Sequence, residues 1–202
     1  MNAYFKLTRY HRFRLGFFAV SFFLCLPSAF ADCPGSFERL FHSQGEKRLP
    51  PLIAQVQDQN CGPASVRSFL LSRGIDVSET NLALLLKTTA LSGTEAQDLV
   101  RVLEHFGFRA EFKQGLTWQD LKLAQSQQRG ILINYQLEGE GHWALVANLQ
   151  KQITLMDPWV ARSERYRVIS ESELLKDWRG FNEGVVTPRA AVIISPGHVL
   201  PH

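Results

Sequence analysis

The sequence predicts an α+β fold in which a helical lobe packs on an antiparallel sheet. The first half of the chain, to about residue 125, places apolar residues at helical spacing and marks the ends of these stretches with capping residues. The second half changes to short apolar and β-branched runs bounded by Gly, Asn or Pro. Because the strands follow the helices and do not alternate with them, we expect an antiparallel sheet.

Two helices are expected between residues 61 and 86. The first begins at Cys61 and ends at Gly74, because glycine readily takes the left-handed conformation of a helix C-cap. The second covers 78–86, with Ser78 as its N-cap. The side chains expected to face inward from this second helix are Leu82, Leu85 and Leu86.

Two further helices complete the predicted helical lobe. A capping box, Thr94 to Gln97, is expected to start the third helix, and Gly107 is expected to end it. The fourth runs from Thr117 to about Gln125. No strand is expected in this half of the chain.

Five strands and one late helix are expected in the second half. The runs share a high β propensity and short length, and each is bounded by turn residues. A helix is expected over 170–178, between the last two strands. The expected strands are 130–135, 142–148, 152–157, 166–168 and 190–194.

The N-terminus has the pattern of a secretory signal peptide over 1–31. Four basic residues between positions 6 and 14 precede an apolar run, 15–26, that is shorter than the roughly 20 residues of a spanning helix. Ala29-Phe-Ala31 is a suitable cleavage site. We therefore expect an exported, periplasmic or secreted protein without stable membrane insertion after cleavage, the alternative being a retained anchor. An irregular lead-in over 32–51, one domain over 52–196 and a loose tail over 197–202 should follow.

Charge and motifs exclude several classes of function. The whole chain carries a formal charge of +3, but residues 1–31 hold four of the 22 Lys and Arg and none of the 19 Asp and Glu, so the remainder is 18 − 19 = −1. No basic patch for nucleic acid is therefore expected. The sequence lacks a Walker A loop, Cys-x-x-Cys and His-Glu-x-x-His, so neither a cofactor nor a metal is expected.

Cys61 is the candidate nucleophile. It stands where a polar loop beginning at Gln55 turns into an apolar helix, and the positive end of a helix dipole favours the reactive thiolate. The polar lead-in makes full burial of this thiol unexpected. Two other interpretations remain open, a disulfide with Cys33 and a buried structural cysteine.

A histidine and an aspartate in the second half can complete the site. His142 begins one predicted strand and Asp157 ends the next, so an antiparallel hairpin would return the aspartate to the edge where the histidine lies. His142 is then the base and Asp157 its orienting group. The alternatives are a histidine at an ordinary strand end and an aspartate that starts a turn. Trp143 and Trp159 flank the pair, as cleft walls or as core residues.

These motifs resemble the papain-like peptidases that cut bacteriocin and lantibiotic leaders after a double glycine, cysteine peptidase family thirty-nine. The matching residues are Gln55 six positions before Cys61, Cys61-Gly-Pro-Ala, Gly141-His142-Trp143 and Asp157-Pro158, and they span roughly 55–160. The resemblance implies a papain-like fold, and the signal-peptide pattern together with the missing Walker A loop predicts a stand-alone, exported form of it. The resemblance also implies that Gln55 helps to form the oxyanion hole, Cys61 attacks, His142 is the base and Asp157 orients it.

The expected function is therefore an exported cysteine peptidase that acts on a peptide or protein. The resemblance implies cleavage after small residues such as a double glycine. Two alternatives stay open: an acyl transferase of the phytochelatin synthase type, which passes the thioester to another amine, and a binding module that keeps the cleft without catalysis. The sequence does not indicate an oligomeric state.

Overall fold

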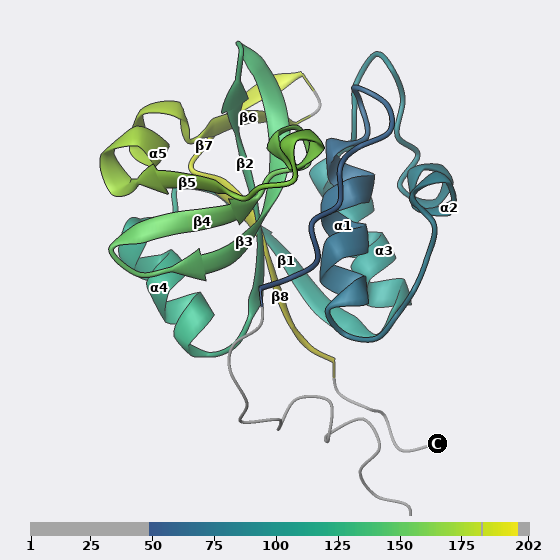
Figure 1. Cartoon of the computed structure of the whole chain (residues 1–202), viewed down its shortest axis with the longest axis horizontal. Coiled ribbons are helices and arrows are strands. Elements are labelled where there is room, and N and C mark those ends of the chain that lie inside the picture. Colours follow the sequence, from purple (N-terminus) through teal and green to yellow (C-terminus); the bar gives the residue numbers. More distant parts are fainter. Residues whose placement is uncertain (1–48, 183, 198–202) are drawn as a thin grey trace, which may run out of the picture. The chain divides into compact units, whose positions relative to one another are not determined.

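A computed structural model describes residues 49–182 and 184–197 (Figure 1). The predicted signal peptide, most of the lead-in with Cys33, and the tail from residue 198 lie outside the described residues. Within the described part, no helix is long and apolar enough to cross a membrane. The elements are α1 (Cys61–Leu71), α2 (Glu79–Leu85), α3 (Ala96–His105), β1 (Phe108–Lys113), α4 (Trp118–Ser126), β2 (Gly130–Leu137), β3 (Glu140–Leu149), β4 (Gln152–Met156), η2 (Val160–Ser163), β5 (Arg167–Ser170), α5 (Glu171–Asp177), β6 (Arg179–Asn182), β7 (Val185–Pro188) and β8 (Ala190–Pro196).

The main sheet has six strands in the order β1-β8-β2-β3-β4-β5, and every neighbouring pair is antiparallel. The expected α+β fold is thereby confirmed. In Figure 1, α1 and α3 lie on one side of this sheet and α4 and α5 on the other. The strands β6 and β7 form a separate two-stranded sheet that contacts β2 and β3.

One apolar core lies between the main sheet and the pair α4 and α5. Side chains from both helices interdigitate there with alternate residues of β2, β3, β4 and β8, as the two-residue repeat of strands requires. Its largest members are Trp118, Tyr135 and Trp178. The strand that carries His142 therefore has a rigid, fully packed support.

The helix α1 begins and ends where the sequence predicts. Pro63 lies in the first turn, where a missing N–H leaves no acceptor unsatisfied. After the last turn, the N–H of Ile75 donates to the carbonyl of Leu70, and Gly74 has a φ of +78°. At the start of the helix, Asn60 occupies the N-cap position, but its side chain does not bond the backbone of the first turn.

Two details of the predicted helices are wrong. Leu85 is 38% exposed, because α2 is a short helix that buries Leu82 and Leu86 but turns Leu85 outward. The third helix starts after Glu95, not at a Thr94 capping box, because the Thr94 hydroxyl pairs with the Thr88 hydroxyl at 2.8 Å. Ser78 and Thr117 do cap α2 and α4, as expected.

Three strands were not predicted. The first, β1, is an edge strand whose residues alternate between buried and exposed, a two-residue repeat that the search for helices in this half missed. The other two, β6 and β7, are short and mostly exposed, so burial left little pattern in them. The five expected strands and the late helix are present, with each end shifted by at most two residues.

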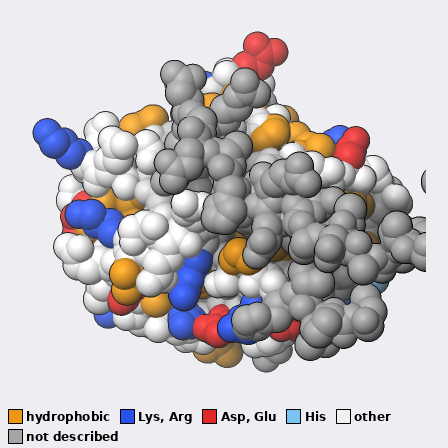
Figure 2. Space-filling model, turned by 90° about the horizontal axis from the view of Figure 1, so that it is seen from below, with side chains coloured by type: hydrophobic (Ala, Val, Ile, Leu, Met, Phe, Trp, Pro, Cys, Tyr) orange, Lys and Arg blue, Asp and Glu red, His pale blue; other side chains and the backbone are white. Residues whose placement is uncertain are grey.

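On the part of the surface that described residues occupy in Figure 2, basic and acidic side chains are interspersed among uncharged ones.

Candidate active site

Cys61 is the first residue of α1 and carries a free thiol. The residue is only 6% exposed, so the expectation that it escapes burial is wrong. The reason is that its helix packs directly on β3: one turn further on, the Ser65 hydroxyl donates to the Trp143 carbonyl at 3.1 Å. The small residue Gly62 makes room for the Thr94 side chain, which a Cβ at that position would strike.

His142 and Asp157 meet as the predicted hairpin requires. The strands β3 and β4 pair antiparallel, with Leu145 opposite Met156, so the two residues come together at one edge. The Nε2 atom of His142 lies 2.8 Å from Oδ1 of Asp157, and both side chains are buried. Since Nε2 faces the carboxylate, Nδ1 is the ring nitrogen left to exchange a proton with Cys61.

The Asp157 carboxylate has several further partners. The Tyr135 hydroxyl donates to Oδ2 at 2.5 Å, and an Arg167 guanidinium nitrogen lies 3.6 Å from the same oxygen. The backbone N–H of Trp159 donates to Oδ1 at 3.0 Å. A buried carboxylate with this many donors stays ionised, because each donor stabilises the charged form.

The electrostatics of the three residues favour a thiolate and imidazolium pair. Burial raises the pKa of the Cys61 thiol, but contact with His142 and backbone N–H donors outweigh it and leave the pKa below its ordinary value. Burial lowers the pKa of His142, yet Asp157 and Cys61 raise it to about 9. Burial raises the pKa of Asp157, whereas hydrogen bonds from His142 and Tyr135 lower it to about 2. At neutral pH the base is therefore protonated and the nucleophile is activated.

Gln55, the predicted oxyanion donor, is buried with its amide turned toward its own loop. Nε2 donates to the carbonyls of Gln57 at 3.0 Å and Asp58 at 2.7 Å, and the buried Oε1 has no hydrogen-bond partner among the described residues. The backbone N–H of Gln55 donates to the Pro158 carbonyl at 3.2 Å. The structure thus brings Gln55 beside the Asp157 turn but does not aim its amide hydrogens at the thiol, and its oxyanion role stays a prediction.

Glu79 anchors the loop that leads to Cys61. Its Oε1 accepts hydrogen bonds from the Val56 N–H at 2.9 Å and from the Asn60 side-chain amide at 2.8 Å. The carboxylate is buried at the start of α2, where the helix dipole favours a negative charge. These two bonds fix the loop against the start of α2. The sequence did not indicate this role, because a single glutamate after an N-cap serine is typical of the first turn of a helix.

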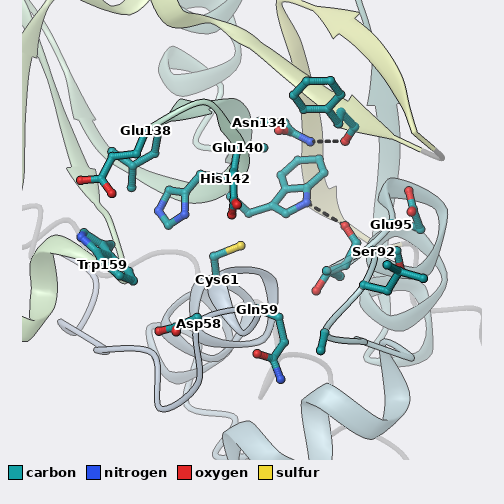
Figure 3. A pocket seen from close by; sticks show the side chains of 18 of the residues that line it. Asp58, Gln59, Cys61, Ser92, Glu95, Asn134, Glu138, Glu140, His142 and Trp159 are labelled. Carbon is teal, nitrogen blue, oxygen red and sulfur yellow. Dashed lines mark hydrogen bonds between the residues drawn. The ribbon is translucent and has the colours of Figure 1, made fainter.

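Cys61 and His142 line a cavity of about 710 Å³ (Figure 3). The residues that surround it come mainly from the segments 58–61 and 90–95, the β2–β3 hairpin and β6. Trp159 forms one wall and is braced by the Arg162 guanidinium, 4.3 Å above its ring, which also pairs with Asp58 at 3.0 Å. Trp143 lies in the opposite wall as a buried residue whose Nε1 donates to the Thr94 carbonyl at 2.9 Å.

Among the residues that the structure describes, no three His, Cys, Asp or Glu side chains gather where they could hold a metal ion.

The fold and these contacts are those of a papain-like, cysteine peptidase-like domain: Cys61 heads a helix, and His142, held by the Asp157 carboxylate, projects from the sheet across a cavity. The chain belongs to the Peptidase C39 family, whose model matches residues 50–183. This finding confirms the resemblance seen in the sequence. A comparison with curated proteins finds no match.

Solved structures support the same fold. The peptidase domain of Streptococcus ComA, a bifunctional ABC transporter, is 22% identical, with a TM-score of 0.56 over 74% of this chain and 99% of that one. A double glycine motif protease of an AMS/PCAT transporter, solved with a leader peptide, is 16% identical, with a TM-score of 0.57 over 76% and 96%. A C39-like peptidase from Bacillus anthracis is 13% identical, with a TM-score of 0.57 over 74% and 95%.

Proposed function

We propose that the protein is an exported cysteine peptidase that hydrolyses peptide bonds through Cys61, His142 and Asp157. The observation that carries the proposal is the buried chain of contacts in which His142 joins Asp157 at 2.8 Å and lowers the pKa of the Cys61 thiol. Membership of the Peptidase C39 family supports a peptide as substrate. Export rests on the signal-peptide pattern of residues 1–31.

The reaction has two halves. In acylation, the Cys61 thiolate attacks the carbonyl carbon, a C–S bond forms and the C=O electron pair moves to oxygen. The oxyanion then collapses, the C–N bond breaks, and the His142 imidazolium gives its proton to the leaving amine. In deacylation, neutral His142 takes a proton from water, the resulting hydroxide attacks the thioester, and the C–S bond breaks to restore the thiolate and imidazolium.

The oxyanion needs hydrogen-bond donors near the N-terminus of α1. The first N–H groups of a helix have no acceptor within the helix, so the Cys61 N–H is suited to this purpose. We propose that Gln55 contributes beside it, as its position six residues before Cys61 implies. For a direct contact, its amide would have to leave the carbonyls of Gln57 and Asp58.

The cavity favours an internal peptide bond over a free C-terminus. Its acidic lining residues are Asp58, Glu95, Glu138 and Glu140, and within the described ranges no Lys or Arg lines it. The cationic group there is the His142 imidazolium, which already faces Asp157 and Cys61, so a terminal carboxylate would meet four acidic side chains and no cation of its own. We propose a peptide or protein substrate cut within the chain, after small residues such as a double glycine, in line with the leader peptide bound to one solved relative.

The proposal is tested first on the thiol. Iodoacetamide should label Cys61 rapidly at pH 6 to 7, because a thiol with a lowered pKa keeps its thiolate where an ordinary cysteine, with a pKa near 8.5, loses it about tenfold per pH unit. Mass spectrometry should read the rate at Cys61 and at Cys33 separately. Slow, equal labelling of both, or a Cys33 to Cys61 bridge in active protein, would contradict the proposal. A mass-spectrometric profile of the peptides that the protein cleaves is the separate experiment that identifies the substrate.

The role of Gln55 has matched controls in the same loop. Gln55→Ala is expected to slow acylation on the order of 100-fold, the usual loss for one oxyanion donor. Gln57→Ala and Gln59→Ala, which change more exposed glutamines, should acylate at about the wild-type rate. Acylation is measured in single turnovers, with melting temperatures recorded for each variant. Equal losses in all three variants would show that the loop was only disturbed.

A further inference from the structure

Tyr135 is buried beside the candidate triad and contacts two of its members. Its side chain is 1% exposed, and its hydroxyl donates to Oδ2 of Asp157 at 2.5 Å. Tyr135 is also the direct cross-strand partner of His142, and the two rings meet edge to face with centroids 5.4 Å apart. One residue of β2 thus touches both the base and its orienting carboxylate.

We propose that Tyr135 is a positioning residue that holds the Asp157 carboxylate in the orientation in which Oδ1 meets His142. The inference rests on the proposed function, because it assigns a role within the same triad.

The division of the two carboxylate oxygens supports this role. Oδ1 is shared by His142 and the N–H groups of Trp159 and Val160, whereas the described partners of Oδ2 are Tyr135 and Arg167. Arg167 is the more distant, at 3.6 Å, and its guanidinium lies 5.5 Å from the centroid of the Tyr135 ring. The short bond to Tyr135 therefore fixes the rotation of the carboxylate, and Arg167 is held through the same ring.

The hydroxyl of Tyr135 stays protonated across the working range. Burial, and then the charge of Asp157, raise its pKa far above the ordinary value, so it always has a hydrogen to donate. Asp157, with its pKa lowered to about 2, always accepts. The bond is thus permanent, unlike the contacts of His142 that change during the reaction. Other ionisable side chains surround the triad. Those around the main cavity are Asp58, Glu95, Glu138 and Glu140, and those around a smaller cavity beside Tyr135 are Arg167, Glu173, Lys176 and Asp177.

Removal of the hydroxyl should weaken the support of the imidazolium. In Tyr135→Phe the ring and its packing remain, but Oδ2 of Asp157 loses its shortest contact and keeps the more distant Arg167, so the carboxylate is held less firmly. His142 then loses part of the partner that raises its pKa to about 9, and that pKa should fall toward 6.5. A tyrosine that merely filled space would leave the titration of His142 where it is.

The test measures the imidazole directly. In a Cys61→Ala background, NMR titration of His142 should show the pKa lowered by about one unit or more when Tyr135→Phe is added. The matched control is Tyr166→Phe, which removes another tyrosine hydroxyl, a partly buried one that donates to the Pro50 carbonyl at 2.6 Å. This change should leave the titration of His142 unchanged. Because this measurement needs no turnover, it decides the role of Tyr135 even if the protein cuts no peptide.

A kinetic cycle gives the second measurement. With Cys61 present, Tyr135→Phe should lower the single-turnover rate of acylation about tenfold or more. In the Asp157→Ala variant the same change should have no further effect, because the two residues act as one unit. If Tyr135→Phe does not fold, Tyr135→Met lacks the hydroxyl and fills the space adaptably. An unchanged His142 titration, or losses that simply add in the double variant, would overturn the proposal.

Discussion

His142→Ala is expected to abolish acylation almost completely, with a loss of about 10⁴-fold or more, as for removal of a catalytic base in related chemistry. The reason is that one ring performs two tasks. It lowers the pKa of the buried Cys61 thiol, which burial alone would raise, and it protonates the leaving amine. Without His142 the nucleophile becomes a buried neutral thiol and the amine has no acid.

The measurement is single-turnover acylation by an activated ester and by a peptide found through cleavage profiling. The ester separates the two tasks, because its leaving group needs no proton and therefore reports thiolate formation alone. Cys61→Ala sets the background, and circular dichroism verifies folding. Wild-type acylation by folded His142→Ala would remove the histidine from the mechanism, and with it most of the argument for a peptidase.

Asp157→Ala is expected to retain measurable activity but to destabilise the protein. An imidazole without its orienting carboxylate still visits the productive position, and a thiol ionises more easily than a serine hydroxyl, so the loss should be smaller than for His142→Ala. The same change removes the acceptor of Tyr135 and the counterion of Arg167, and breaking a buried pair costs about 3 to 5 kcal/mol. Asp157→Asn keeps the shape of the side chain and should therefore lower the free energy of unfolding less than Asp157→Ala does.

The pH dependence of unfolding distinguishes these variants. The folded pKa of Asp157 is lowered to about 2, so its contribution to stability is present above the unfolded value near 4 and is lost as the pH falls toward 2. The folded pKa of His142 is raised to about 9, so its contribution is full below about 6.5 and is lost as the pH rises through 9. Urea unfolding at pH 3, 7 and 9 should show both declines in the wild type, whereas Asp157→Ala should lose the acid decline and keep a weaker alkaline one, because Cys61 also raises the pKa of His142. Identical pH profiles for the two proteins would contradict this assignment.

The sequence predicts the residues whose chemistry and position are both unusual. Cys61 stands at the start of a helix, His142 lies near the start of one strand and Asp157 follows the end of the next, so simple hairpin geometry brings the latter two together. Tyr135 could not be found in this way, because a lone tyrosine at the end of an apolar run reads as core. Its only signal is that a buried hydroxyl needs a partner, and the sequence does not say which one.

Contacts between distant segments limited the prediction in the same manner. Glu79 bonds a loop some 20 residues away, and the Gln55 amide turns toward carbonyls two and three residues further along. Neither orientation leaves a periodic pattern. The edge strand β1 did leave one, since its buried and exposed residues alternate, and it could have been found by a search for strands in the helical half.

Trp143, the residue next to the base, ties the sheet to the helical lobe at two points. Its carbonyl accepts from Ser65 of α1 and its indole N–H donates to the Thr94 carbonyl ahead of α3, both in buried surroundings. To swing the lobes apart, both bonds would have to break, and a buried group left unsatisfied costs about 1 to 3 kcal/mol. Separating the helices from the sheet at this point is therefore costly. Under the proposed function, a peptide enters a passage whose walls are joined at Trp143, so the shape of that passage contributes to the choice of peptide when it docks.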